Sequence, residues 1–306
     1  MRKLLLLFAP LLCSLVLFLL LLTISNTMEN RIMKKRIYTL LSQNISLTSK
    51  FESYKDQTKN LRQIVISSNT PDAKNTHIGN IINQTLNRMD GDVSLYYKNL
   101  TTGESVIVDG AHTYYMASLY KVIVTLYILE AEKAGKLSLS DTIGTPPITL
   151  KLALNKIITE SNNEYAQAIA EKYGWKKIEQ FITAELGISF SFNEDLTTTV
   201  TDMGSLFESI SKAINISDTE SNTLLDLLHR QTKTNKLPKY LPKHIYIHNK
   251  TGEFENYSHD AGIFYTPKAN YILIYMSKTP NPGTTDETMA KISEKIYNIL
   301  NDVPNQ

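Results

Sequence analysis

Ser118 and Lys121 place a hydroxyl and an amine three positions apart at the start of an apolar stretch. Side chains at positions i and i+3 share one face of a helix, so the Lys121 amine can reach the Ser118 oxygen. A serine is a poor nucleophile until a base removes its proton, and a desolvated lysine near another cation can be neutral enough to act as that base. This spacing predicts acyl-transfer chemistry at Ser118.

The surroundings of this pair favour a site over a chance occurrence. Residues 122–129 are apolar on nearly every side, and Gly135 supplies a plausible stop, which is typical of a core helix whose N-terminus faces a site. A second Ser-x-x-Lys sequence, from Ser209 to Lys212, lies in a segment of mixed polarity. We interpret that second copy as a solvated helix face.

Two further elements follow downstream. Ser161 and Asn163 lie between the apolar stretch 150–158 and a predicted helix at 164–173. A Lys-Thr-Gly sequence then ends the alternating run 245–248, which is typical of a strand. A glycine there lets a ligand lie close against the strand edge. The Lys-Thr-Gly element consists of Lys250, Thr251 and Gly252.

In this order and setting, the three elements resemble those of the penicillin-recognising serine enzymes, namely the class A β-lactamases and the D-Ala-D-Ala peptidases. The octapeptide 115–122 resembles the class A nucleophile segment, and the threonine-rich segment 197–203 resembles the start of a family helix. The resemblance covers roughly residues 78–300.

The resemblance implies a role for each motif residue. Ser118 would be the nucleophile and Lys121 its base, while Ser161 would relay a proton to the leaving nitrogen. Binding roles fall to the other motif side chains: Asn163 would hold the substrate amide, and Lys250 and Thr251 the substrate carboxylate. The Lys250 charge would also lower the pKa of Lys121. The backbone N–H groups of Ser118 and of Glu253, which follows Gly252, would form the oxyanion hole.

The sequence departs from the class A pattern where deacylation is concerned. Class A β-lactamases activate a water with a glutamate in a Glu-x-x-x-Asn arrangement, but neither Glu185 nor Glu194 has an asparagine four residues later. We therefore expect a long-lived acyl-enzyme. Glu164 and Glu253 are interpreted as solvated rim carboxylates, although either could replace the missing base.

His259 and Asp260 are adjacent in sequence and follow the Lys-Thr-Gly element, and a histidine beside a carboxylate suggests acid-base chemistry. Adjacent residues of a strand point to opposite faces, so these two cannot work as a pair. We predict that Asp260 has a structural role, such as pairing a loop, and leave the role of His259 open.

The N-terminal segment, residues 1–28, predicts a membrane location. Arg2 and Lys3 precede the uncharged residues 4–24, which are long enough to span a bilayer. The charges ahead of the span favour an orientation with the rest of the chain outside the cytoplasm. We expect an uncleaved single-pass anchor; the alternative is a signal segment that is removed, leaving a secreted protein.

Residues 29–76 are predicted to form a helical stalk and linker. Mostly apolar positions alternate by four and three from Met33 to Val65, which is the seam of a coiled coil. Two interpretations stay open: a coiled-coil stalk that forms a homodimer or binds a membrane partner, and a single helix that folds back on its own domain. The remaining residues, 77–306, are predicted to form one domain.

The element order in that domain predicts an α/β (α+β) fold. Strands are expected at 93–97, 105–109, 244–250, 261–266 and 271–277, with helices in the middle and at both ends. They predict a five-stranded antiparallel sheet flanked by the N- and C-terminal helices, with an all-helical subdomain alongside, as in β-lactamases and transpeptidases. The active site is expected between the two lobes.

Composition excludes several functions. The net charge of +2, from 32 basic and 30 acidic residues mixed along the chain, does not favour a nucleic-acid partner. No Cys/His cluster or glycine-rich phosphate loop is present in the sequence, so we expect neither a metal nor a cofactor. The resemblance implies a serine hydrolase acting on a β-lactam or a peptidoglycan stem peptide. The alternative is a non-catalytic envelope scaffold that keeps the fold to bind cell-wall peptide.

Overall fold

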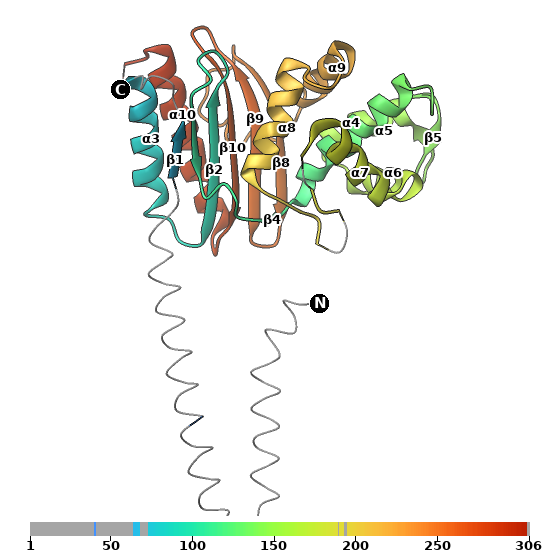
Figure 1. Cartoon of the computed structure of the whole chain (residues 1–306), viewed down its shortest axis with the longest axis horizontal. Coiled ribbons are helices and arrows are strands. Elements are labelled where there is room, and N and C mark those ends of the chain that lie inside the picture. Colours follow the sequence, from blue (N-terminus) through green and yellow to red (C-terminus); the bar gives the residue numbers. More distant parts are fainter. Residues whose placement is uncertain (1–39, 41–63, 68–72, 189, 193–194, 305–306) are drawn as a thin grey trace, which may run out of the picture. The chain divides into compact units, whose positions relative to one another are not determined.

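An antiparallel sheet with the strand order β1-β3-β2-β10-β9-β8 is the centre of the fold (Figure 1). The computed structural model describes residues 40, 64–67, 73–188, 190–192 and 195–304. The five predicted strands are all present, and a short sixth strand is added at the edge. The strands are β1 (Ile64–Ser67), β2 (Asp92–Asn99), β3 (Ser105–Val108), β8 (Tyr246–Phe254), β9 (Tyr257–Tyr265) and β10 (Asn270–Lys278).

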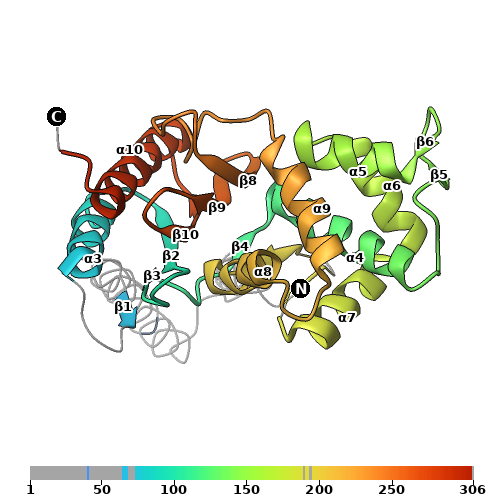
Figure 2. The same ribbon diagram turned by 90° about the horizontal axis from the view of Figure 1, so that it is seen from above.

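The two faces of the sheet are buried against different helices, because successive strand side chains alternate between faces. On β10, Tyr271 and Leu273 belong to the core beneath α3 (Ala73–Leu86) and α10 (Pro282–Asn301). Ile272 and Ile274 belong to the opposite core, beneath α8 (Val200–Lys212). Figure 2 shows α3 and α10 together on one side of the sheet and α8 on the other.

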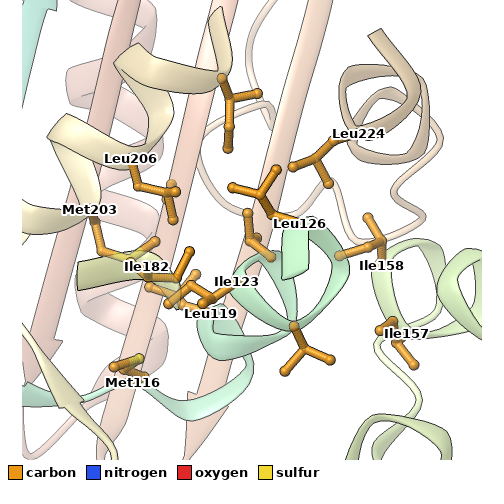
Figure 3. Packing of buried hydrophobic residues seen from close by; sticks show 14 of the residues in the cluster. Met116, Leu119, Ile123, Leu126, Ile157, Ile158, Ile182, Met203, Leu206 and Leu224 are labelled. Carbon is orange, nitrogen blue, oxygen red and sulfur yellow. The ribbon is translucent and has the colours of Figure 1, made fainter. Parts of the chain in front are cut away.

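A helical part adjoins the α8 face. It contains α4 (Tyr120–Lys133), α5 (Leu150–Thr159), α6 (Asn163–Tyr173), α7 (Trp175–Leu186) and α9 (Asp218–His229). Helix α4 is its centre: Ile123 and Leu126, and Leu119 just before the helix, are completely buried and pack among side chains of the surrounding helices (Figure 3). The expected core helix after Ser118 is therefore confirmed, and its all-round burial fixes the position of its first turn.

Two short strand pairs complete the fold. Strand β4 (Tyr114–Tyr115), just before Ser118, pairs with β7 (Thr197–Thr198), so the nucleophile segment is tied to the threonine-rich segment. Strand β5 (Thr142–Ile143) pairs with β6 (Ile148–Thr149) at the far end of the helical part.

The structure corrects two sequence predictions. Val65, the last position of the predicted stalk seam, lies in β1 and pairs with Ile107 of β3, because its β-branched neighbours suit an edge strand. Ser209 is buried in α8 rather than solvated, because its side of the helix packs into the core.

The predicted anchor, and the predicted stalk apart from Leu40 and residues 64–67 and 73–76, lie outside the described residues. Leu40 is helical and exposed. In the part of the chain that the structure describes, no helix has the length and apolar character needed to cross a membrane.

Two helical glycines offer a matched test of the packing between α8 and the sheet. A Cβ at Gly204 would lie 2.7 Å from ring atoms of the buried Tyr96, whereas a Cβ at Gly283 in α10 would meet nothing within 4 Å. We expect Gly204→Ala to destabilise the protein by about 1–3 kcal/mol through overpacking. Gly283→Ala should be neutral or stabilising by at most about 1 kcal/mol. Urea unfolding followed by circular dichroism would measure both, and equal stabilities would contradict this packing.

Candidate active site

The structure brings Ser118 and Lys121 into hydrogen-bond contact. Ser118 is partly exposed in a short 3-10 turn, η1 (Ala117–Leu119), and Lys121 is in the first turn of α4. The Lys121 Nζ lies 3.0 Å from the Ser118 Oγ and is completely buried. Its other partners are oxygens: the Ser161 carbonyl at 2.7 Å, the Ser161 Oγ at 3.2 Å and the Asn163 Oδ1 at 2.5 Å.

The surroundings of Lys121 make its ammonium easier to deprotonate than that of an exposed lysine. Burial, and next the charge of Lys233, lower its pKa to about 8 from an ordinary value of 10.5. Within the described residues, no ion pair includes Lys121 or Lys250. An amine without a carboxylate partner can lose its proton near neutral pH and then accept the proton of Ser118.

Ser161 and Asn163 reach this amine from the connection between α5 and α6. Ser161 has a φ of +59°, which turns the chain between the two helices. Asn162 lies between them in sequence, and its Oδ1 accepts a hydrogen bond from the Tyr165 N–H at 2.9 Å, which caps α6. This cap fixes the backbone on both sides of Asn162, so Ser161 and Asn163 point to the same amine.

Lys250 closes the site from the sheet. Its Nζ is buried and lies 2.9 Å from the Ser161 Oγ and 2.7 Å from the Thr251 carbonyl. Ser161 therefore lies between the two amines of Lys121 and Lys250 and can relay a proton between them. The Thr251 Oγ1 is buried and has no hydrogen-bond partner in the described part of the chain.

The pKa of Lys250 is lowered by the same effects as that of Lys121. Burial, then the charges of Lys121 and Lys233, hold the pKa of Lys250 well below its ordinary value. Burial is the main cause at both lysines. Their neighbouring ammonium groups also disfavour each other's charge, as the resemblance implied, and Lys233 adds to this effect. Sequence reasoning missed Lys233, because nothing in its spacing connects it with the motifs.

The Lys-Thr-Gly element lies inside β8, which continues to Phe254 rather than ending at Lys250 as predicted. At Gly252 the strand comes close to the nucleophile segment. A Cβ there would be 3.0 Å from the Met116 carbonyl oxygen and 3.3 Å from the Ala117 Cβ. The glycine is therefore required for contact between the edge strand and the turn that carries Ser118.

His259 holds the backbone before the nucleophile. Its Nδ1 accepts a hydrogen bond from the Ser277 N–H at 3.1 Å, so its Nε2 carries the proton and donates to the Tyr115 carbonyl at 2.8 Å. Burial lowers the pKa of His259 to about 4, which keeps the ring neutral. The role left open by the sequence is thus a link between the sheet and the nucleophile segment.

Asp260 has the structural role that the sequence predicted. Its carboxylate accepts hydrogen bonds from the Leu237 N–H at 3.1 Å and the Asn249 Nδ2 at 2.9 Å, and so ties the loop before β8 to the sheet. Burial outweighs these hydrogen bonds and the lysine charges, and raises the pKa of Asp260 to about 6.

Glu253 pairs with two lysines that sequence reasoning did not connect with the site. Its carboxylate lies 3.2 Å from the Nζ of Lys233 and 3.1 Å from the Nζ of Lys236. Partial burial opposes ionisation, but the charge of Lys236 and the hydrogen bonds from both lysines lower the pKa of Glu253 overall. Glu253 is therefore a paired rim carboxylate and a weak base, while Glu164 is exposed to solvent.

Apolar side chains fill the described part of the loop that precedes Thr197. Phe190 and Phe192 are buried, and the ring of Phe192 lies 5.8 Å from that of Trp175, which in turn contacts Tyr120 beside Lys121. Glu185 is exposed at the end of α7, and Glu194 lies outside the described residues.

No ligand set for a metal is found in the described part of the chain, where no group of three or more His, Cys, Asp or Glu side chains is placed to hold one. A surface hollow of about 620 Å³ lies beside α3 and α10, and none of the predicted site residues lines it. The chemistry is thus concentrated where α4, the connection from α5 to α6, and β8 meet.

The fold and this group of side chains define the class of protein: a serine hydrolase of the β-lactamase and penicillin-binding protein kind. Residues 77–300 match the model of the β-lactamase enzyme family, and the chain belongs to that family.

Solved structures share the fold. The structure of PBP-A matches with a TM-score of 0.70 and 22% identity, over 78% of this chain and 100% of its own. A β-lactamase from Sphaerobacter thermophilus matches with a TM-score of 0.67 and 16% identity, over 75% and 99%. A PBP-A variant solved as an acyl-enzyme complex with penicillin G matches with a TM-score of 0.69 and 22% identity, over 74% and 97%. No curated protein sequence matches the chain.

The buried amine gives a direct prediction of its titration. Because burial and Lys233 lower the pKa of Lys121 to about 8, its ammonium should lose its proton with a midpoint near pH 8. Lysine-selective NMR of the full-length protein would measure this, with Lys121→Arg used to assign the signal. Lys233→Ala should raise the midpoint, because it removes a neighbouring positive charge. A midpoint above pH 10 would show that Lys121 cannot serve as the base.

Proposed function

We propose that this protein is an extracytoplasmic active-site-serine hydrolase that forms an acyl-Ser118 intermediate with a β-lactam or a D-alanyl peptide amide. The observation that carries the proposal is the buried Lys121 amine, 3.0 Å from the Ser118 Oγ and without a carboxylate partner in the described residues. Such an amine is a suitable general base for a serine.

Acylation begins when the neutral Lys121 amine takes the Ser118 proton and the Ser118 Oγ attacks the substrate carbonyl carbon. The resulting oxyanion accepts hydrogen bonds from the backbone N–H groups of Ser118 and Glu253. The contact at Gly252 supports this pairing, because it holds β8 against the Ser118 turn. Asn163, whose Oδ1 accepts from Lys121, keeps its amide N–H group for a substrate carbonyl.

Collapse of the intermediate breaks the carbon–nitrogen bond and needs a proton on the leaving nitrogen. The Ser161 hydroxyl donates that proton and is resupplied by Lys121 or Lys250, which lie 3.2 and 2.9 Å from its Oγ. Lys250 and the unpartnered Thr251 hydroxyl receive the carboxylate of the leaving group. An anion beside Lys250 also raises the pKa of this lysine and so favours its charged form.

Deacylation is the slow step in this proposal. A water must be activated to release the acyl group, and the described carboxylates at the rim do not suit that task. Glu253 is engaged by two lysines, Glu164 and Glu185 are exposed, and Phe190 and Phe192 fill the loop. The protein then behaves as a penicillin-binding peptidase more than as an efficient β-lactamase.

The same proposal places the enzyme at the cell membrane. The uncharged residues 4–24 would anchor the chain, and the heptad pattern after them would hold the catalytic region away from the bilayer, with a homodimeric stalk as one arrangement. The natural partner would then be the stem peptide of peptidoglycan. Protease accessibility of the catalytic region in intact cells and in lysed cells would test this location.

The acyl-enzyme can be tested by intact mass spectrometry of the full-length protein mixed with benzylpenicillin. We expect a one-to-one adduct that persists for many minutes, because no efficient base releases it. Ser118→Ala should abolish the adduct, and Lys121→Ala should slow its formation at least 100-fold, which is the lower end of a general base's contribution. Ser209→Ala, in the other Ser-x-x-Lys sequence, is the matched control and should leave adduct formation unchanged.

Other outcomes separate the alternatives. Rapid loss of the adduct with continued drug hydrolysis would make the protein a β-lactamase with another deacylating base. No adduct from the intact protein would contradict acylation by β-lactams. Full cellular function in the Ser118→Ala strain would favour the non-catalytic, peptide-binding scaffold.

A further inference from the structure

Three lysines lie near the end of the site that would receive the substrate carboxylate. Two of them already pair with a carboxylate of the protein itself. Lys233 and Lys236 precede β8 and both pair with Glu253, while Lys250 lies on the same strand. The charge of Lys233 acts on both Lys121 and Lys250, so its ammonium lies within electrostatic reach of the reacting groups. Glu253 therefore contributes a negative charge where a substrate carboxylate would bind.

The positions along β8 place Glu253 next to the unoccupied hydroxyl of Thr251. These residues are two apart, so their side chains share one face of the strand, about 6–7 Å apart. The Thr251 Oγ1 is buried without a partner in the described residues, whereas the Glu253 carboxylate, with 45% of its side chain exposed, pairs with Lys233 and Lys236. The same face thus holds an unsatisfied donor and an ion pair that solvent reaches.

The two lysines hold Glu253 differently. Lys236 is completely buried and keeps other partners, the Ser258 Oγ at 2.5 Å, the His259 carbonyl at 3.2 Å and the Asp286 carboxylate at 3.7 Å. Lys233 has 40% of its side chain exposed, and Glu253 is its ion-pair partner among the described residues. Replacing Glu253 by another carboxylate at Lys233 therefore breaks only a half-exposed ion pair. The loss of such a pair costs little free energy.

We propose that the Glu253 carboxylate is a built-in occupant of the substrate-carboxylate subsite, and that a substrate carboxylate displaces it from Lys233. This inference rests on the proposed function and adds Lys233 to the residues that select substrates with a free carboxylate on the leaving-group side. Glu253 stays with Lys236 during the exchange. The ion pair between Glu253 and Lys233 thus reduces affinity for every carboxylate substrate.

The test compares the second-order rate constants for Ser118 acylation of the full-length protein by benzylpenicillin and by its methyl ester, at low ionic strength. Glu253→Gln should speed acylation by benzylpenicillin about threefold to fivefold, the range expected from a half-exposed ion pair. Lys233→Ala should slow it by a similar factor. Lys233→Ala also raises the pKa of Lys121 and so slows acylation by both probes, which makes the ratio of the two rate constants the readout. That ratio should rise in Glu253→Gln and fall in Lys233→Ala, and Glu253→Gln should no longer raise it in the double variant.

Two matched controls separate this exchange from a general effect of charge. Glu255→Gln removes an exposed carboxylate from the same hairpin, and Lys243→Ala removes an exposed ammonium ahead of β8. Both should leave the ratio of the two rate constants unchanged. The proposal is overturned if Glu253→Gln slows acylation by benzylpenicillin or changes both probes equally, and also if Lys233→Ala leaves the ratio unchanged.

A binding measurement keeps this inference separate from the proposed chemistry. In the Ser118→Ala protein, NMR titration would compare acetyl-D-alanyl-D-alanine with its C-terminal amide. Glu253→Gln should tighten binding of the free acid about threefold and leave the amide unchanged. Suppose that the protein with Ser118 forms no adduct, while the Ser118→Ala protein shows this difference between the acid and the amide. The acyl-enzyme would then be refuted, and the exchange at Lys233 would still hold. Equal effects on both ligands would refute the exchange, whatever the acylation result.

Discussion

Burial of the Lys121 amine is the constraint on which the rest of the site depends. An ammonium in a low-dielectric interior is costly unless it is paired with a carboxylate, and in the described residues Lys121 has only neutral oxygen partners. Burial therefore lowers the pKa of Lys121 to about 8, so that a larger share of the amine is neutral and can act as a base towards the neighbouring hydroxyl. The charge of Lys233 acts in the same direction.

Much of the fold serves to hold that amine in place. Helix α4 is buried nearly all round, so its first turn cannot shift without disturbing the core. The neutral His259 fixes the backbone before Ser118 from the sheet side, and Gly252 lets the edge strand approach the same turn. The side chains that the helices and the sheet contribute to the site are thus held in fixed positions. Acyl transfer requires reacting groups that are aligned in this way.

The lysines of the site have two kinds of environment, one beside Ser118 and one at Glu253. Beside Ser118, burial lowers the pKa of Lys121 and Lys250, whereas Lys233 stays half exposed and paired with Glu253. In the described part of the loop before Thr197, Phe190 and Phe192 are buried, and Phe192 contacts Trp175. Membership of the β-lactamase enzyme family does not by itself fix the rate of turnover, which depends on the groups at the site.

The sequence by itself determined the motif residues, the five main strands and the burial of α4, because these depend on local spacing and on hydrophobic periodicity. It did not determine that β8 continues past Lys250, that Val65 pairs in an edge strand, or that Ser209 is buried, because pairing and burial depend on distant partners. Only the tertiary structure revealed Lys233, Lys236 and the hydrogen bond from His259 to Tyr115. Electrostatics and hydrogen bonds act through space, and residues that lie far apart in sequence become neighbours only when the chain folds.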